Sequence, residues 1–383
     1  MSAPTLNRAL WQDQPHIPGT IRDSKLPSTD ELDEHKILIK VHAWAINPCD
    51  YMLQDRDIPG FGYPIILGCD VAGTVVAISP TSRFRIGDRV FGVTANNGFQ
   101  EYVTLDERLM ARIPDNSNLE FRDTVGFGLC IVTAAMLLFG KDWLNLDFPS
   151  LGVRIPKSAK IILIWGGSSA VGSNAIQLVT AAGYNAIVTC SAANFDYVKR
   201  LGAVDAFNYK DPDVAEKVAA ALFNSECECA GILMAAGLKA GNDGVCKVAA
   251  ALEQKQTQTQ KQKQKQINFT TSDLLDPLDQ VPENLVLKKP DLASFKPFPE
   301  CYFDTTTATF GGFLPEALEK GVYQVAPPPL VVNKKGLEGI QEAIDLQRLI
   351  GEKGYEAFKE AAVNVSGAGG GAVLPAKLVV ERS

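Results

Sequence analysis

The segment Lys160–Val179, KIILIWGGSSAVGSNAIQLV, decides the fold of this chain. Its apolar residues from Ile161 to Trp165 predict a buried strand, and a turn of small residues follows at once. That turn has the pattern Gly-x-Ser-x-x-Gly from Gly167 to Gly172, and the residues after it are typical of a helix. A strand, a glycine-rich turn and a helix in this order form the setting of a dinucleotide-binding fingerprint.

The two glycines of this motif have different expected roles. We expect Gly167 to allow the tight reversal and Gly172 to let helix and strand pack closely. Backbone amides at the start of the helix then favour an anion such as a pyrophosphate. The predicted pyrophosphate-binding residues are Gly167, Ser168, Ser169, Ala170 and Val171.

The end of the next predicted strand, Ala186–Ser191, indicates which cofactor binds. NAD-binding proteins usually carry an acidic residue near this point for the ribose 2′-hydroxyl. Here Ser191 ends the strand, and Asn194, Tyr197 and Lys199 follow it. Hydroxyl, amide and cationic groups donate to a 2′-phosphate, so the pattern favours NADP(H) over NAD(H). The alternative is that Tyr197 and Lys199 are ordinary surface residues of a helix.

Length and composition set the class of protein. A chain of 383 residues suits two domains. Hydrophobic residues make up 46% and mean hydropathy is +0.01, as in a soluble globular protein. The net charge of −7 argues against nucleic acid or an anionic membrane as the main partner. The sequence has no run of 18 or more apolar residues, and its first residues lack the apolar core of a signal peptide. We therefore expect a cytoplasmic protein.

Cysteine and histidine usage argues against several kinds of site. Eight cysteines scattered over 383 residues are too sparse for a disulfide scaffold. The three histidines all lie within the first 42 residues, so a His-rich catalytic metal site is excluded.

The predicted secondary structure changes near residue 120, from short strands to alternating helices and strands. Before it, many short apolar runs broken by Gly and Pro predict a barrel-like all-β unit. The expected strands are Ile37–Ile46, two runs within Ile65–Ile78, Arg89–Val93 and Gln100–Leu105. After it, a helix over Asp123–Phe139 precedes alternating strands and helices, which predict a parallel, doubly wound sheet.

Two segments interrupt this pattern. The low-complexity tract 253–266 is rich in Gln and Lys, contains no apolar residue, and predicts a mobile surface insertion. A basic arm that grips an acidic partner is the alternative. The glycine-rich segment Gly367–Ala372 predicts a flexible connection to a last strand, Ala376–Val380.

Four further motifs carry a family resemblance. They are Asn47-Pro48-Cys49-Asp50, Leu67–Val75 (LGCDVAGTV), Gly87–Gly92 (GDRVFG) and Gly98–Val103 (GFQEYV). Together with the fingerprint, in this order, they resemble the medium-chain dehydrogenase/reductase superfamily. The resemblance implies an α/β protein with a GroES-like β-barrel catalytic domain over 1–124 and 321–383. A Rossmann NADP-binding domain with a doubly wound parallel sheet would occupy 125–320.

Within that superfamily the chain is most similar to the zinc-independent quinone reductases and the fungal trans-acting enoyl reductases. Zinc-dependent relatives carry a cysteine at the position of Asn47 and a Gly-His-Glu at Gly68-Cys69-Asp70. A catalytic zinc needs three protein ligands around an open position. Coordination by Cys49, Cys69 and Asp70 is the alternative to buried structural thiols, and we expect no metal.

The resemblance also implies roles along the cofactor. Asn47 would lie beside the nicotinamide ribose and ring, Thr133 near the nicotinamide end, and Lys377 near the cofactor. Phe310, after a Thr-rich strand, would approach the carboxamide. Ser191, Asn194 and Tyr197 would take the 2′-phosphate, and Tyr209 would lie near the adenosine. Two plainer readings stay open: Thr133 as a hydroxyl bonded to its own helix, and Asn47 as an Asn-Pro turn residue.

The predicted catalytic residues are Tyr51 and Asn47. A phenol with a pKa of about 10 can donate a proton to an enolate or quinol oxygen, and water is the alternative donor.

The resulting hypothesis is an NADPH-dependent, metal-independent oxidoreductase that reduces an activated C=C bond or a quinone. The alternatives are a carbonyl reductase or alcohol dehydrogenase, and an NADPH-binding accessory protein without turnover. Expected partners are a small-molecule substrate (an enone, enoyl thioester or quinone), a second copy in a homodimer, and a carrier protein if a polyketide pathway is involved. The loops 54–63 and 281–299 are expected to shape the substrate pocket.

Overall fold

The computed structural model describes residues 6–28, 32–56, 62–151, 159–259, 266–272, 281–289, 300–366 and 376–383. Contacts divide the chain into two compact units. Unit 1 contains Met1–Leu129 and Phe310–Ser383, and unit 2 contains Cys130–Thr309. The boundaries thus fall after Leu129 and Thr309, where the sequence suggests 124 and 320.

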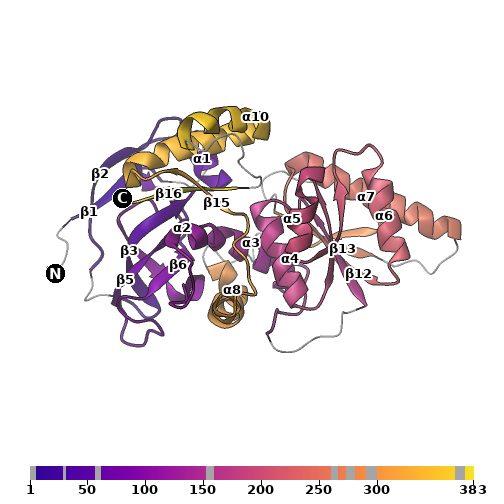
Figure 1. Cartoon of the computed structure of the whole chain (residues 1–383), viewed down its shortest axis with the longest axis horizontal. Helices are drawn as coiled ribbons and strands as arrows, with labels where there is room; N and C mark the ends of the chain where they lie inside the picture. Colours follow the sequence, from indigo (N-terminus) through magenta and orange to yellow (C-terminus); the bar gives the residue numbers. More distant parts are fainter. Residues whose placement is uncertain are drawn as a thin grey trace. The chain divides into compact units, whose positions relative to one another are not determined.

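Unit 2 is built on a six-stranded sheet in which all neighbouring strands are parallel (Figure 1). The strand order is β11-β10-β9-β12-β13-β14. This is the doubly wound order, and it reverses between β9 and β12. The predicted fold class is confirmed. The strands are β9 (Lys160–Trp165), β10 (Asn185–Cys190), β11 (Ala203–Asn208), β12 (Glu228–Met234), β13 (Ile267–Thr271) and β14 (Leu285–Leu287).

Helices cover both faces of this sheet. Figure 1 shows α4 and α5 on one side and α6 and α7 on the other. Alternate residues of β9, such as Ile161 and Leu163, pack with Val218 of α6 and Val245 of α7 in one buried cluster. The helices are α3 (Gly128–Phe139), which begins in unit 1, α4 (Ala170–Ala181), α5 (Phe195–Arg200), α6 (Val214–Asn224) and α7 (Leu238–Thr259).

The first part of the Gln/Lys tract is helical, which corrects the expectation of a mobile insertion. Residues 253–259 continue α7 without a break. Gln, Lys and Glu are good helix formers, so a tract without apolar residues can still extend an existing helix. Residues 260–265 of the tract lie outside the described residues.

Unit 1 holds a seven-stranded sheet and a three-stranded sheet. The larger has the order β15-β16-β3-β5-β6-β8, with β7 also paired to β3, and the smaller has the order β2-β1-β4. Near its C-terminal end the chain contributes β16, which pairs antiparallel with β3. The strands of the larger sheet are β3 (Lys36–Ala45), β5 (Asp70–Ile78), β6 (Arg89–Val93), β7 (Tyr102–Asp106), β8 (Met110–Arg112), β15 (Pro329–Asn333) and β16 (Lys377–Glu381). Those of the smaller are β1 (Asn7–Gln12), β2 (Thr20–Ser24) and β4 (Ile65–Ile66).

Helices of different lengths complete unit 1. Helix α1 (Pro48–Asp55) contacts α10 (Ile340–Ser366), which bends at Gly354, where φ is 78°. Helix α2 (Phe121–Thr124) precedes α3, and α9 (Leu314–Glu319) follows a π-helical turn at Thr309–Phe313. The predicted flexible connection Gly367–Ala372 lies outside the described residues.

The Thr-rich segment before Phe310 is a helix, α8 (Phe303–Ala308), where the sequence suggests a strand. Threonine favours strands through its β-branched side chain. Here the Oγ1 atoms of Thr306, Thr307 and Thr309 donate to main-chain carbonyls four residues earlier, at 2.7–3.0 Å. These bonds satisfy the hydroxyls within a helix, so the strand prediction is wrong.

The apolar helical segment that the sequence predicts over Asp123–Phe139 begins at Phe121 in the structure. Within the described residues, Phe121–Phe139 is long and apolar enough to cross a membrane, and 67% of its most apolar window is buried inside the protein. Burial of this extent is typical of a core helix.

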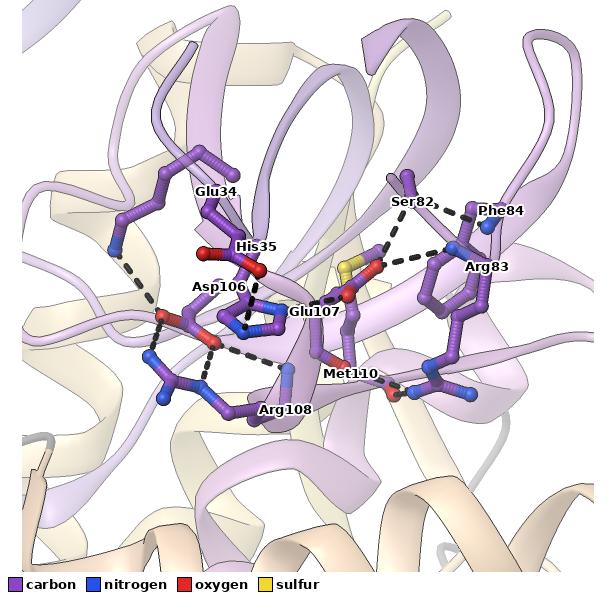
Figure 2. A network of polar contacts seen from close by, with 10 residues as sticks. Glu34, His35, Ser82, Arg83, Phe84, Asp106, Glu107, Arg108 and Met110 are labelled. Carbon is purple, nitrogen blue, oxygen red and sulfur yellow. Dashed lines mark hydrogen bonds and ion pairs between the residues drawn. The ribbon is translucent and has the colours of Figure 1, made fainter. Parts of the chain in front are cut away.

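A polar network anchors the start of β3 in unit 1 (Figure 2). The carboxylate of Glu107 accepts from His35 Nδ1 at 2.9 Å, from Ser82 Oγ at 3.0 Å and from the Arg83 amide at 3.3 Å. The Arg83 guanidinium donates to the carbonyls of Glu107 and Met110. The network therefore joins three segments that are distant in sequence.

Candidate functional site

The turn between β9 and α4 lies where the strand order of unit 2 reverses. Gly166, rather than the predicted Gly167, makes the reversal, because its φ is +84°. Gly167 is needed for a close approach, since a Cβ there would lie 2.7 Å from Val188 Cβ. A Cβ on Gly172 would collide with the Gly166 carbonyl oxygen, as expected for a close helix–strand contact.

Some backbone amides of this turn already donate hydrogen bonds within the protein, and others have no partner within the helix. Ser169 caps α4: its Oγ accepts from the Gly172 amide at 3.0 Å and donates to the Ala235 carbonyl at 3.3 Å. The Ser169 amide donates to the Gly166 carbonyl, so it is already engaged. Ala170 and Val171 are the first helical residues, whose amides have no partner within the helix. Of the predicted pyrophosphate-binding residues, Ala170 and Val171 therefore have amides available to an anion, and Ser168 beside them is partly exposed.

Polar side chains gather after β10 and β11. Asn194 Nδ2 donates to Ser191 Oγ at 3.0 Å, which fixes both groups just past the end of β10. The Tyr209 amide donates to the Cys190 carbonyl, and its side chain is 48% exposed. The structure thus brings Ser191, Asn194 and Tyr209 together past the ends of β10 and β11, at one edge of the parallel sheet.

The Tyr197 side chain contacts α4 instead of joining Ser191 and Asn194. Its hydroxyl donates to Ser173 Oγ of α4 at 2.9 Å, and burial raises its pKa to about 12. This contact positions α4 against α5, so the geometry favours a supporting role over the predicted 2′-phosphate contact. Thr133 is partly exposed between buried neighbours in α3.

Unit 1 contains a buried polar network around Asn47. The Asn47 side chain donates through Nδ2 to Asp70 Oδ2 at 3.0 Å and accepts through Oδ1 from Lys377 Nζ. Lys377 also forms an ion pair with Asp70, with 3.4 Å between Nζ and Oδ2. The Leu129 amide at the start of α3 donates to Asp70 Oδ1 at 2.6 Å. All three residues are at most 5% exposed, so Asn47 is more than a turn residue.

The carboxyls of this region are electrostatically unusual. Burial, with a further contribution from the Asp70 charge, raises the pKa of Asp50 to about 7 against the hydrogen bond from the Asn47 amide. Burial also raises the pKa of Asp70, against the opposing Lys377 charge. One ammonium group therefore faces two carboxyls that both resist ionisation.

Sequence reasoning missed the two glycines that make room for this network. A Cβ on Gly126 would lie 2.8 Å from Lys377 Cγ, and one on Gly128 would collide with Asp70 Oδ1. Gly126 stands two residues before α3 and Gly128 is its first residue. Their spacing resembles no motif, so only the fold reveals their role.

Two predicted site residues, Phe310 and Tyr51, have side chains outside the polar network around Asn47. The Phe310 side chain is 0% exposed and its ring lies 6.2 Å from that of Phe91, so only its main chain is left for a cofactor contact. The Tyr51 hydroxyl lies against Gly351 of α10, and burial raises its pKa. Neither side chain belongs to the Asn47–Asp70–Lys377 network.

Comparison with known proteins identifies the family. The alcohol dehydrogenase GroES-like domain model matches residues 33–115. The dehydrogenase orf1 of Aspergillus niger is 43% identical over 217 residues, which cover 54% of this chain and 61% of that protein. The trans-enoyl reductase himH of Aspergillus japonicus is 34% identical, over 90% of this chain and 95% of that protein. The chain belongs to the medium-chain dehydrogenase/reductase superfamily.

A solved structure of the superfamily shows the same fold. Mycobacterial Rv1454c, determined in complex with NADPH, is 20% identical with a TM-score of 0.61. The match covers 98% of this chain and 99% of that one. At this identity the likeness concerns the fold alone.

The positions at which zinc-dependent members of this superfamily bind their catalytic metal do not fit zinc here. Asn47 supplies an amide in place of a thiolate, and both Asn47 and Asp70 are bonded to Lys377. An ammonium group beside Asp70 already neutralises charge there, and a catalytic zinc needs three free donor side chains.

Proposed function

We propose that this protein is an NADPH-dependent oxidoreductase that transfers hydride, without a catalytic metal, to an activated C=C bond or a quinone. The observation that carries the proposal is the β9–α4 turn at the reversal of the sheet, followed by Ser191 where NAD-binding relatives place an acid.

The described residues offer specific groups to the cofactor. The amides of Ala170 and Val171 would hold the pyrophosphate at the start of α4. Ser191 Oγ accepts from Asn194, so its own proton is free to point to a 2′-phosphate, and Asn194 keeps a second N–H. When bound, NADPH supplies the hydride.

Substrate activation would rest on hydrogen-bond donors. Reduction of an enone places hydride on one carbon and a proton on its neighbour, and a donor at the carbonyl oxygen stabilises the charge that develops. We assign this role to the side chains predicted near the nicotinamide, Asn47 and Lys377, with Thr133 and the Phe310 main chain as cofactor contacts. Tyr51 remains the proposed proton donor, and water is the alternative.

The substrate class is supported by the relatives. The himH protein is named a trans-enoyl reductase, which favours C=C reduction here over carbonyl reduction. A cytoplasmic location, a homodimer and a carrier-protein partner stay predictions.

A cofactor-oxidation assay tests the proposal. The full chain is dialysed against a chelator and given NADPH or NADH with enones, enoyl thioesters, quinones or aldehydes, while the absorbance of the reduced cofactor is followed. We expect oxidation with an enone or quinone, a preference for NADPH, and equal rates before and after chelation. Turnover of aldehydes alone that stops on chelation would show a zinc alcohol dehydrogenase. Tight NADPH binding with no acceptor consumed would show an accessory role.

A further inference from the structure

Helix α10 packs against α1, the helix that carries the proposed proton donor Tyr51 (Figure 1). Arg348 of α10 binds both carboxylate oxygens of Asp55, at 2.5 Å from Nε and 3.0 Å from Nη2. Its Nη2 also donates to Gln54 Oε1 at 2.7 Å, and Gln54 exchanges hydrogen bonds with Gln341 at 2.9 and 3.1 Å. A bidentate contact fixes direction as well as distance, so the last turn of α1 is held in one orientation on α10.

The Tyr51 hydroxyl lies against the bare main chain of α10 at Gly351. A Cβ added at Gly351 would be 2.7 Å from Tyr51 Cζ and closer still to Tyr51 Oη. Ordinary non-bonded contacts begin near ~3.5 Å, so a larger residue would displace the hydroxyl or the helix by about 1 Å. Glycine therefore lets both groups keep their places.

The backbone itself does not require glycine at position 351. Gly354 has a φ of 78°, whereas the residues of α10 before it are helical. In a helix interior glycine costs about 1 kcal/mol relative to alanine. Gly351 is exposed, and the three atoms nearest to an added Cβ all belong to Tyr51. The contact with Tyr51 is thus the feature that a glycine serves here.

The Tyr51 hydroxyl is available to donate a hydrogen bond. Within the part of the chain that the structure describes, no group forms a hydrogen bond with Tyr51 Oη, and the residue is half-buried. Burial raises the pKa of the phenol, so it carries its proton at neutral pH. Packing against Gly351, and not a hydrogen bond within the protein, sets where this O–H group lies.

We propose that Gly351 is a positioning residue for the proton-transfer step, which holds the Tyr51 hydroxyl where the substrate accepts its proton, while Arg348 fixes α1. This inference rests on the proposed function, with Tyr51 as the donor. Hydride addition to the C=C bond leaves an enolate. The O–H bond of Tyr51 then breaks, a C–H or O–H bond forms on the substrate, and the electron pair stays on the phenol oxygen until water returns a proton. A general acid must lie within about 2.6–3.2 Å of the atom that it protonates, so a displacement of about 1 Å matters.

A double-mutant cycle in the NADPH-oxidation assay tests this assignment. Gly351→Ala should lower kcat for an enone about tenfold or more, while KM and the affinity for NADPH change less than about twofold. The solvent deuterium isotope effect on kcat should rise, because proton transfer becomes slower relative to hydride transfer. In a Tyr51→Phe background, which has already lost the donor, Gly351→Ala should change kcat less than about twofold. Lys353→Ala, at an exposed position of the same helix, is the matched control and should retain kcat.

Arg348 supplies a second pair of variants, which decides the matter if Gly351→Ala does not fold. Arg348→Met removes the bidentate contact with Asp55, so it should lower kcat severalfold when Tyr51 is present and leave kcat unchanged in the Tyr51→Phe background. Arg348→Lys keeps the charge without the planar fork and should restore part of the loss.

Three results would overturn the inference. These are an unchanged kcat in Gly351→Ala, equal losses from Gly351→Ala with and without the Tyr51 hydroxyl, and full activity of Tyr51→Phe, which would make water the donor. In each of these cases the unaltered chain still oxidises NADPH, so the proposed function stands. No NADPH oxidation by the unaltered chain with any acceptor would overturn the proposed function and this inference with it.

Discussion

At the scale of single residues, the proposed preference for NADPH is assigned to Ser191. The change Ser191→Asp places a carboxylate where the proposal puts the 2′-phosphate. Repulsion between like charges should lower kcat/KM for NADPH at least about tenfold and raise the relative efficiency with NADH. Ser191→Ala removes one donor without adding charge, so its effect should be smaller. Steady-state kinetics with both cofactors measure the ratio, and an unchanged ratio in Ser191→Asp would contradict the assignment.

Lys377 supports a second prediction at this scale. Lys377→Met should lower the free energy of unfolding by about 3–5 kcal/mol, because it leaves Asp70 buried without its cation. Lys335→Met is the matched control: its ion pair with Glu342 spans 2.9 Å but is exposed, so the loss should stay below about 1 kcal/mol. Urea unfolding measures the free energy of unfolding of both variants. Equal losses would show that the buried ion pair stabilises the fold no more than the exposed one.

At the scale of elements, the sequence predicts local arrangements better than distant ones. The strand, turn and helix around Gly172 are contiguous, so their pattern identifies the βαβ unit. The contacts of Asn47 with Asp70 and Lys377 join residues 23 and 330 positions apart, and no local pattern reports such pairs. Individual propensities also mislead, since the Thr-rich segment becomes helix α8 once its hydroxyls bond to helix carbonyls.

The network that anchors β3 predicts acid sensitivity (Figure 2). Burial alone would raise the pKa of Glu107, but hydrogen bonds from His35, Ser82 and the Arg83 amide hold it below its usual value. A depressed folded-state pKa stabilises the fold above the unfolded-state pKa of about 4.3, and this stability is lost as pH falls through the folded-state value.

Glu107→Gln tests this network. It should cost about 1–2 kcal/mol at neutral pH, because it weakens hydrogen bonds to a charged acceptor. The difference from the unaltered chain should shrink below pH 4. Glu338→Gln, at an exposed pair with Arg8, should cost less. A difference for Glu107→Gln that is constant between pH 3 and 7 would rule out the carboxylate as the source.

At the scale of the whole molecule, the two units differ in how the chain builds them. Unit 2 is one continuous segment, whereas unit 1 needs both ends of the chain. We therefore expect residues 130–309 to fold cooperatively when expressed alone. Residues 1–129 alone lack β15, β16 and α10 and should not fold. Thermal unfolding followed by circular dichroism distinguishes the two fragments, and a cooperative transition in residues 1–129 would contradict the expectation.

The position of β16 has a consequence for synthesis. It is the last strand of the chain, yet it lies between β15 and β3 in the larger sheet of unit 1. Unit 2 can mature while translation continues, because its residues emerge before β16 is made. The first unit must wait with an open sheet until residues 377–381 have been translated and have left the ribosome.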